Sequence, residues 1–228
     1  MNRGFIKFPS TPYLSSFNPE SDRVRNDKCL SQKERNLFLS HKIIIEEKID
    51  GANLGISFDK DGNPIFQNRG GTIKLFSGQW KKLFSWYLSH ENFLFEALLD
   101  RFVLFGEWCY ACHSIYYNRL PDYFIAFDIY DKQAGFFMSV EKRNLFLKGS
   151  GIFCVPFIGR GLYSIEQLKN TIHISQYGQE IAEGLYLRID EGEWLKQRAK
   201  FVRTSFHQSI DNHWSRTTLI RNRLKNNP

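Results

Sequence analysis

The sequence predicts an α+β domain in which antiparallel sheets are flanked by helices. Three observations support this class: strongly apolar runs that read as strands are widely separated, helical patterns lie between them, and turns rich in Asp and Gly join neighbouring strands as hairpins. The chain has 228 residues, the size of one medium domain. We therefore expect one domain over 1–228, with a lead and helix (1–41), a core (42–203) and a basic helical tail (204–228).

The expected strands follow from apolar patterning along the chain. Prolines make residues 1–21 irregular, and spaced apolar positions among charges predict a helix within 22–40. Apolar segments and turn residues predict strands over 42–48, 54–58, 65–68, 102–109 and 123–130, and two more strands, over 183–189 and 194–202, flank the turn Asp190-Glu191-Gly192-Glu193. Asp59-Lys60-Asp61-Gly62-Asn63 is a hairpin turn and not a calcium loop, because the Glu that closes such a loop is missing.

Three further helices are expected between the strands. One runs over 79–99, and its apolar side chains at helical spacing should face the core: Trp80, Leu83, Phe84, Tyr87, Phe93 and Leu98. A second runs over 140–147 and ends at Gly149 and Gly151. The third begins at Ser164, where Ser164-Ile165-Glu166-Gln167 fits a capping box.

The charge balance favours a polyanionic partner. The formal net charge of +7 suits nucleic acid or a phosphate-rich small molecule, although a solvated basic surface without a partner is the alternative. The sequence shows neither an apolar leader nor an apolar run long enough to span a bilayer. We therefore expect a cytoplasmic protein that contacts no membrane and whose four cysteines are reduced.

One short pattern, Cys109-Tyr110-Ala111-Cys112-His113, matches the attachment sequence of c-type haem. Haem attachment normally requires an exported chain, and structural zinc would need a second cysteine pair or paired histidines. We therefore interpret Cys109 and Cys112 as strand and loop residues. His113 either contacts a substrate or neighbour, or is a hydrogen-bonded loop histidine.

Lys48 is the leading candidate for chemistry. It lies where the buried strand begun by Ile43–Ile45 ends, and the tight turn Asp50-Gly51 follows it. A lysine ammonium is a poor nucleophile, but burial beside cationic neighbours can lower its pKa and turn it into a covalent catalyst. A hairpin turn after a lysine-tipped strand is the alternative interpretation.

The segment Lys48-Ile49-Asp50-Gly51-Ala52-Asn53 resembles the first motif of the covalent nucleotidyltransferases, which comprise DNA ligases, RNA ligases and mRNA capping enzymes. The resemblance implies a nucleotidyltransferase domain with its ATP pocket between the sheets and helices. It also implies that Lys48 attacks the α-phosphate of a nucleotide and carries the nucleoside monophosphate as a phosphoramidate.

Three further segments resemble motifs of this superfamily and follow in its order. Arg69 resembles the arginine of motif Ia, which contacts the nucleotide and the 5′-phosphate end; a solvated arginine before a Gly-Gly turn is the alternative. Glu107 in Phe105-Gly106-Glu107-Trp108 resembles the motif III glutamate that bonds the ribose. Phe127 before Asp128 resembles the motif IIIa aromatic that stacks on the purine, with a core phenylalanine as the alternative.

Two motifs complete the resemblance. Glu183 in Glu183-Gly184-Leu185 resembles the motif IV glutamate that acts on the metal, and Arg198-Ala199-Lys200 stands at motif V, Lys-x-Lys. Arginine replaces the first lysine; it keeps the charge and can clamp a phosphate, but it cannot give up a proton. Any acid role there passes to Lys200.

The resemblance therefore implies a defined set of site residues. The catalytic residues are Lys48, Glu183, Arg198 and Lys200, and Glu183 is also the metal ligand. The nucleotide-binding residues are Glu47, Asp50, Asn53, Arg69, Glu107, Phe127 and Lys200.

Within the superfamily, the chain resembles the ATP-dependent RNA ligases that repair breaks. The blocks Cys112–Phe124 and Phe206–Trp214 carry this closer resemblance. It implies ATP with covalent AMP on Lys48, Mg²⁺ (or Mn²⁺), and RNA with 5′-phosphate and 3′-hydroxyl ends. It leaves open whether that RNA is a nicked duplex and whether a protein partner supplies a substrate-binding module.

The residues after motif V are too few for the OB-fold of DNA ligases and capping enzymes, so we expect a small member without one. Arg216, Arg221, Arg223 and Lys225 make this tail basic and suited to phosphates, with a solvated helix as the alternative. Three rivals remain at this stage: a minimal DNA ligase, a guanylyltransferase acting on RNA ends, and a non-catalytic nucleic-acid-binding module.

Overall fold

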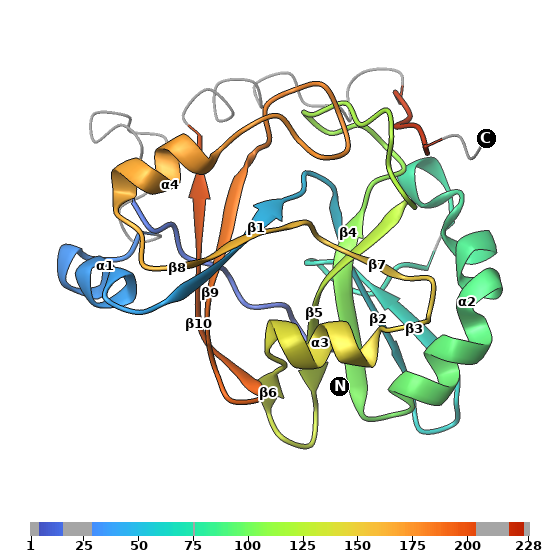
Figure 1. Ribbon diagram of the computed structural model, residues 1–228. Coiled ribbons are helices and arrows are strands. Elements are labelled where there is room, and N and C mark those ends of the chain that lie inside the picture. Colours follow the sequence, from blue (N-terminus) through green and yellow to red (C-terminus); the bar gives the residue numbers. More distant parts are fainter. Residues whose placement is uncertain (1–4, 16–28, 75, 204–218, 226–228) are drawn as a thin grey trace.

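Two sheets form the frame of the molecule, and helices lie on their outer sides (Figure 1). The computed structural model describes residues 5–15, 29–74, 76–203 and 219–225. Paired strands in both sheets are antiparallel, except for one short parallel pair in the second sheet. The predicted class, antiparallel sheets flanked by helices, is confirmed. The division of the chain into a lead, a core and a tail stays a prediction.

The first sheet has the strand order β10-β9-β1-β8. Its strands are β1 (Ile43–Lys48), β8 (Phe157–Gly161), β9 (Gly184–Glu191) and β10 (Trp194–Val202). Ile43 and Ile45 pack in one apolar cluster with residues of helices α1 (Gln32–Leu39) and α4 (Ile165–Thr171). Because side chains alternate along a strand, Ile44, Glu46 and Lys48 face the second sheet instead.

The second sheet has the strand order β3-β2-β4-β5-β6, with β7 paired to β5. Its strands are β2 (Ala52–Phe58), β3 (Pro64–Gln67), β4 (Phe102–Trp108), β5 (Phe124–Asp131), β6 (Phe136–Phe137) and β7 (Phe153–Cys154). Gly106 in β4 is required by packing, because a Cβ there would collide with the ring of Phe124 and the carbonyl oxygen of Ile125. Because side chains alternate along a strand, the next residue, Glu107, lies on the opposite face, which looks toward the first sheet.

Buried ion pairs join the two sheets. Arg188 of β9 pairs with Asp128 of β5, and both side chains are fully buried. Arg143, on helix α3 (Val140–Phe146), donates to Glu46 of β1 at 2.6 Å. Both arginines also donate to the carbonyl oxygen of Phe127, at 2.6 Å from Arg143 and 3.3 Å from Arg188. The two sheets are therefore fixed relative to each other at Phe127, next to the candidate site.

The helices follow the predicted pattern with one correction. The segment 79–99 is a 3-10 turn, η2 (Gly78–Trp80), followed by α2 (Leu83–Leu98). Leu83 is fully buried as predicted, but Phe84 is 44% exposed and packs at the edge against Phe76. Adjacent helical residues point about 100° apart, so only one of this pair can face the core. The capping box at Ser164 is confirmed: its side chain accepts from the Gln167 amide and its amide donates to the Gln167 side chain.

The sequence pattern missed the edge strand β8, which lacks a continuous apolar run and contains two glycines. The tail is also different from the prediction where the structure describes it: residues 219–225 are extended and form bridges with Ala111 and Leu120, and they are not helical. Arg216 and the block 206–214 lie outside the described residues. In the part of the chain that is described, no helix is long and apolar enough to cross a membrane.

Candidate active site

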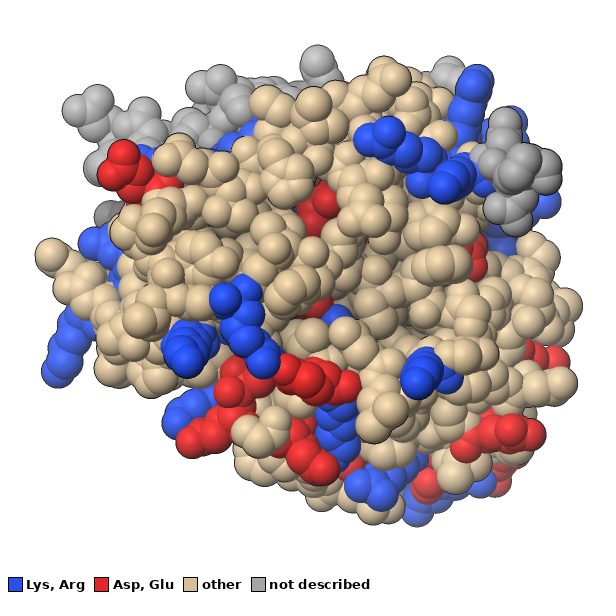
Figure 2. All heavy atoms as spheres, in the orientation of Figure 1, with Lys and Arg blue, Asp and Glu red and all other residues tan. Residues whose placement is uncertain are grey.

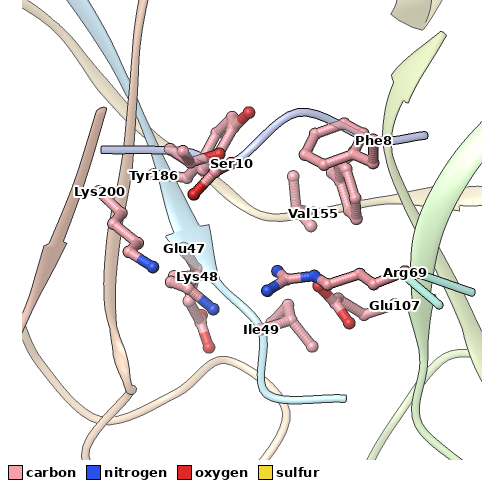
Figure 3. A pocket seen from close by; sticks show the side chains of 12 residues that line it. Phe8, Ser10, Glu47, Lys48, Ile49, Arg69, Glu107, Val155, Tyr186 and Lys200 are labelled. Carbon is pink, nitrogen blue, oxygen red and sulfur yellow. The ribbon is translucent and has the colours of Figure 1, made fainter. Parts of the chain in front are cut away.

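A cavity that is partly open to solvent lies between the two sheets at the end of β1 (Figure 3). Strands of both sheets supply its walls: Lys48 from β1, Tyr186 from β9, Lys200 from β10, Glu107 from β4 and Phe127 from β5. Residues that are far apart in the sequence, including five predicted nucleotide-binding residues, are therefore brought together in one hollow.

A second hollow adjoins the first and is more open. It shares Lys48, Arg69 and Glu107 with the first cavity. Asp50 and Asn53 contribute to its wall. Lys48 thus lies where an enclosed cavity meets an open one, so its amine can be reached from both.

The amine of Lys48 is bonded to Glu183. The register of β1 and β9 places Lys48 opposite Gly184, so the preceding residue, Glu183, lies beside the lysine. Lys48 Nζ donates to Glu183 Oε2 at 2.6 Å, and the two side chains are 19% and 9% exposed. Gly184 is required here because a Cβ would collide with the backbone of Phe201 on β10. Predicted nucleophile and predicted metal ligand are therefore direct neighbours.

Carboxylates control the charge of Lys48. Burial lowers the pKa of its amine, but the negative charge and the hydrogen bond of Glu183 oppose burial, and the net pKa is raised. Burial likewise raises the pKa of the Glu183 carboxyl, against the attraction of Lys48. The expected lowering of the lysine pKa by burial beside cations is therefore not found, and Lys48 is held as an ammonium.

Glu107 has an unsatisfied oxygen. Its Oε2 atom is buried and has no hydrogen-bond partner within the described residues, and the same holds for the side-chain nitrogen of Asn53. The two residues are directly opposite each other on β4 and β2. Burial raises the pKa of the Glu107 carboxyl to about 8, opposed by Lys48 and Arg69. A buried polar atom without a partner is costly, so this pair suits a polar ligand.

Cations surround the amine of Lys48. Figure 3 shows Lys200 on one side of Lys48 and Arg69 on the other, with Glu107 close to the arginine. Lys200 also lies close enough to Glu183 to attract its carboxylate. This spacing of positive groups around one amine favours the binding of a phosphate ester.

Asp50 and Glu47 are both tied to neighbouring loops. Asp50 Oδ2 accepts from the amides of Ser114 at 2.7 Å and Ile115 at 3.0 Å. Glu47 accepts from the side chain of Ser175 and from the amide of Gln176. Both carboxylates therefore fix loops around the cavity, and their predicted contacts with the nucleotide stay predictions.

Arg198 is placed differently from Lys200, although both belong to the predicted motif V. Its guanidinium donates to Asp128 Oδ2 at 2.9 Å and to the hydroxyl of Tyr186 at 3.1 Å. It also lies 4.0 Å from the ring centroid of Phe137. Lys200 lines the cavity and Arg198 does not. Its predicted phosphate contact stays a prediction, and the geometry shows an arginine already bound to a carboxylate.

Sequence reasoning missed a segment that completes the cavity. Residues 5–15, which we call the N-terminal strap, run from the second sheet to the first, and Phe8, Ser10 and Thr11 line the cavity (Figure 3). The strap is fastened at Gln67, whose side chain bonds both the amide and the carbonyl of Ile6, and by backbone bonds to Lys200. Its prolines predicted an irregular segment. Only its apolar and aromatic residues indicated that it packs against the rest of the domain.

Tyr13 of the strap holds the side chain of Lys200. The Lys200 ammonium lies 4.0 Å from the centroid of the Tyr13 ring, and the backbone bridges join the same two residues. Burial raises the pKa of the Tyr13 hydroxyl, with a further contribution from Glu183. The strap therefore positions a predicted phosphate-binding residue as well as covering the cavity.

The sequence profile of the RNA ligase family matches residues 41–202. The chain belongs to the RNA ligase family. The matched range begins just before β1 and ends with β10, so it includes Lys48, Glu183 and Lys200. Among curated proteins, none matches this sequence.

Solved structures of Naegleria gruberi RNA ligase share the fold. A mutant with ATP and Mn is 16% identical and has a TM-score of 0.61 over 92% of this chain and 60% of that chain. The enzyme with pyrophosphate is 21% identical, with a TM-score of 0.59 over 78% of this chain and 56% of that chain. This chain therefore covers 56–60% of the length of those two Naegleria gruberi chains.

Proposed function

We propose that the protein is an ATP-dependent RNA ligase that seals RNA ends bearing 3′-hydroxyl and 5′-phosphate groups, by way of a lysyl-AMP and an adenylylated RNA. One observation carries the proposal: the buried Lys48 amine lies where two hollows meet, bonded to Glu183 and flanked by Lys200 and Arg69. Family membership supports RNA as the substrate. Structures of the Naegleria gruberi ligase with ATP, Mn or pyrophosphate support ATP as the nucleotide.

In the first step, the neutral Lys48 amine attacks the α-phosphorus of ATP. A nitrogen–phosphorus bond forms, the bond from the α-phosphorus to the bridging oxygen breaks, and pyrophosphate leaves. The ammonium must lose a proton before it attacks, and Glu183 Oε2, at 2.6 Å, is the acceptor within reach. Lys200 and Arg69 stabilise the charge that develops on the phosphate oxygens.

Glu183 fits a divalent metal that arrives with the triphosphate. In the described part of the chain, no cluster of three or more acidic, histidine or cysteine side chains could hold an ion alone. Mg²⁺ is commonly held by one or two carboxylates together with substrate phosphates and water, so one buried carboxylate beside the cavity is a sufficient protein contribution. When bound, the metal neutralises charge on the triphosphate.

The enclosed cavity suits the nucleoside. Glu107, which lines both hollows, and Asn53, which lines the open one beside it, present unsatisfied buried polar atoms on neighbouring strands, as the ribose hydroxyls require. Phe127, with an 8% exposed side chain, lines the enclosed cavity and offers an aromatic surface for the base. We propose that Arg69, which belongs to both hollows, receives the RNA 5′-phosphate from the open side.

In the second step, an oxygen of the RNA 5′-phosphate attacks the α-phosphorus of the lysyl-AMP. The nitrogen–phosphorus bond breaks, and a pyrophosphate linkage joins AMP to the RNA end. In the third step, the 3′-hydroxyl attacks the 5′-phosphate, a phosphodiester forms and AMP leaves. Lys48 regains a proton after the second step, and Glu183 is the neighbour that can return it.

The first test is labelling with α-³²P-ATP and Mg²⁺, followed by denaturing electrophoresis. Lys48→Arg is the matched variant, because it keeps the positive charge beside Glu183 but cannot form the phosphoramidate. We expect a labelled band for the wild type that pyrophosphate discharges, and none for Lys48→Arg. Equal labelling of both proteins would contradict Lys48 as the nucleophile, and labelling by GTP alone would contradict ATP.

The second test separates RNA from DNA joining. Nicked and splinted substrates are prepared in matched pairs that differ in a ribose or deoxyribose sugar at the 3′-hydroxyl end. We expect sealing of the ribose-terminated strands. Faster sealing of the all-DNA nick would contradict RNA ligation while leaving the lysyl-AMP chemistry intact.

A further inference from the structure

The described tail, residues 219–225, runs along the loop that follows β4, and we call it the C-terminal clip. Backbone hydrogen bonds fasten it at both ends of that loop: the amide of Cys112 donates to Ile220, and the amide of Leu120 donates to Arg223. The bridges pair Ala111 with Arg221 and Leu120 with Leu224. The clip is therefore an ordered, extended part of the domain and not a solvated helix.

Asn222 anchors the clip. Its side chain is 2% exposed and makes three hydrogen bonds to backbone: Oδ1 accepts from the Tyr117 amide at 2.9 Å, and Nδ2 donates to the carbonyl oxygens of Cys109 and Ala111 at 2.8 and 3.2 Å. Side chains alternate along an extended chain. With Asn222 directed inward, Arg221, Arg223 and Lys225 are left on the outer side, and all three are exposed.

These three cations form a row with regular spacing. Alternate residues of an extended segment are roughly 6.6 Å apart, which is close to the separation of successive phosphates along an extended nucleic-acid strand. Within the described residues, no carboxylate forms an ion pair with any of the three. Figure 2 shows blue side chains gathered at the upper right, over the part of the fold where Figure 1 places the clip.

The clip is joined to the catalytic turn through one loop. Tyr117 donates its amide to Asn222 of the clip, and its hydroxyl accepts from the amide of Asp50, two residues after Lys48. Asp50 in turn holds the amides of Ser114 and Ile115. The same loop reaches the open hollow, because His113 bonds Gln79, which lines it. The loop that holds the clip therefore also borders the hollow that contains Lys48 and Arg69.

We infer that Arg221, Arg223 and Lys225 form a phosphate track that holds the backbone of the RNA strand whose end enters the open hollow. This inference rests on the proposed function for the identity of the strand. The track is expected to contact phosphates and not bases, because exposed cations bind the nucleic-acid backbone and carry no sequence information. The inference therefore assigns RNA binding to a surface of this domain.

The test compares two triple variants by the salt dependence of RNA binding. The track variant is Arg221→Gln, Arg223→Gln, Lys225→Gln; the matched control is Lys33→Gln, Lys60→Gln, Lys148→Gln, which removes the same charge from exposed positions elsewhere. Binding of a fluorescent 5′-phosphorylated single-stranded RNA is measured by anisotropy between 50 and 200 mM salt. Loss of three contacts should reduce the slope of log K against log salt by about 2.

Over that fourfold salt range, a slope smaller by about 2 means that the salt effect on affinity is about 20-fold weaker in the track variant. The control should keep the wild-type slope. An unchanged slope in the track variant, or an equal decrease in both variants, would overturn the track. Lysyl-AMP formation is measured in parallel and should be equal in all three proteins, so a failure of the proposed chemistry is recognised separately from a failure of RNA binding.

Discussion

The protonation of Glu107 provides the sharpest test of the nucleoside pocket. Burial raises the pKa of this carboxyl to about 8, and its Oε2 atom has no partner in the described residues. At pH 7 only about a tenth of the molecules therefore carry the ionised group. A carboxylate accepts hydrogen bonds from both ribose hydroxyls, whereas a neutral carboxyl has a weaker acceptor. Ribose binding should strengthen as the pH rises.

The magnitude follows from the ionised fraction. With the pKa of Glu107 at about 8, that fraction rises from roughly 0.03 at pH 6.5 to roughly 0.76 at pH 8.5, so affinity should increase by up to about 25-fold. Adenosine is the suitable ligand, because it lacks phosphates whose own titration would obscure the effect. Its dissociation constant is measured by calorimetry across this range for the wild type and for Glu107→Gln.

Two controls test whether the ionisation of Glu107 and its contact with the ribose cause the pH dependence. Glu107→Gln keeps the size of the side chain and cannot ionise, so its adenosine affinity should be nearly independent of pH. Dideoxyadenosine lacks the ribose hydroxyls and should show the same flat profile with the wild type. A pH dependence of equal size for dideoxyadenosine, or for Glu107→Gln, would refute the assignment of Glu107 to the ribose.

The remaining predictions concern stacking, positioning, motif V and stability. Phe127→Ala should raise the ATP concentration needed for half-maximal lysyl-AMP formation by about 5- to 150-fold, from 1–3 kcal/mol of stacking; an unchanged requirement would argue against stacking. Tyr13→Leu should slow single-turnover labelling on the order of 2- to 30-fold by removing the ring beneath Lys200, whereas Tyr13→Phe, which keeps the ring, should not. Lys200→Ala should slow labelling more than Arg198→Ala, whose main effect should be a lower melting temperature, because Arg198 is bound to Asp128. Between pH 4.5 and 8, Glu107 is ionised in the unfolded but not in the folded protein, so its contribution to the free energy of unfolding falls as the pH rises. In urea titrations, Glu107→Gln should therefore lose about 1.4 kcal/mol less stability per pH unit than the wild type. Parallel plots of unfolding free energy against pH for the two proteins would contradict the raised pKa.

The strands could be predicted because their signal is local. Strands β1, β4 and β5 contain apolar runs bounded by turn residues, and buried strands of this kind can be recognised without knowledge of their partners, whereas β9 and β10 are marked by the turn that joins them. The capping box at Ser164 and the glycine turns likewise depend on a few neighbouring residues. Motif spacing then located Lys48, Glu107, Phe127, Glu183 and Lys200, and the fold gathers all of them around the two hollows.

What escaped prediction depends on contacts between distant parts of the chain. The strap has no periodic pattern, and its role appears only when Gln67 and Lys200 fasten its ends across two sheets. The clip carries no strand signal, because its bonds are made to residues about a hundred positions earlier. The charge state of Lys48 is also a property of assembly, since Glu183 and Glu107 reach it from different sheets.

The placement of the site across the seam of two sheets explains why it needs such additions. Lys48 and Lys200 belong to the first sheet, and Glu107 and Phe127 to the second, so a small shift between the sheets would separate the predicted nucleophile from the predicted nucleoside-binding residues. Three features oppose that shift: the ion pairs of Arg143 and Arg188, the strap over the cavity, and the loop held by Asp50. The catalytic turn contributes to the third feature itself, because Asp50 follows Lys48 by two residues. The short segment from Lys48 to Asp50 therefore carries the predicted nucleophile and also helps to join the two sheets.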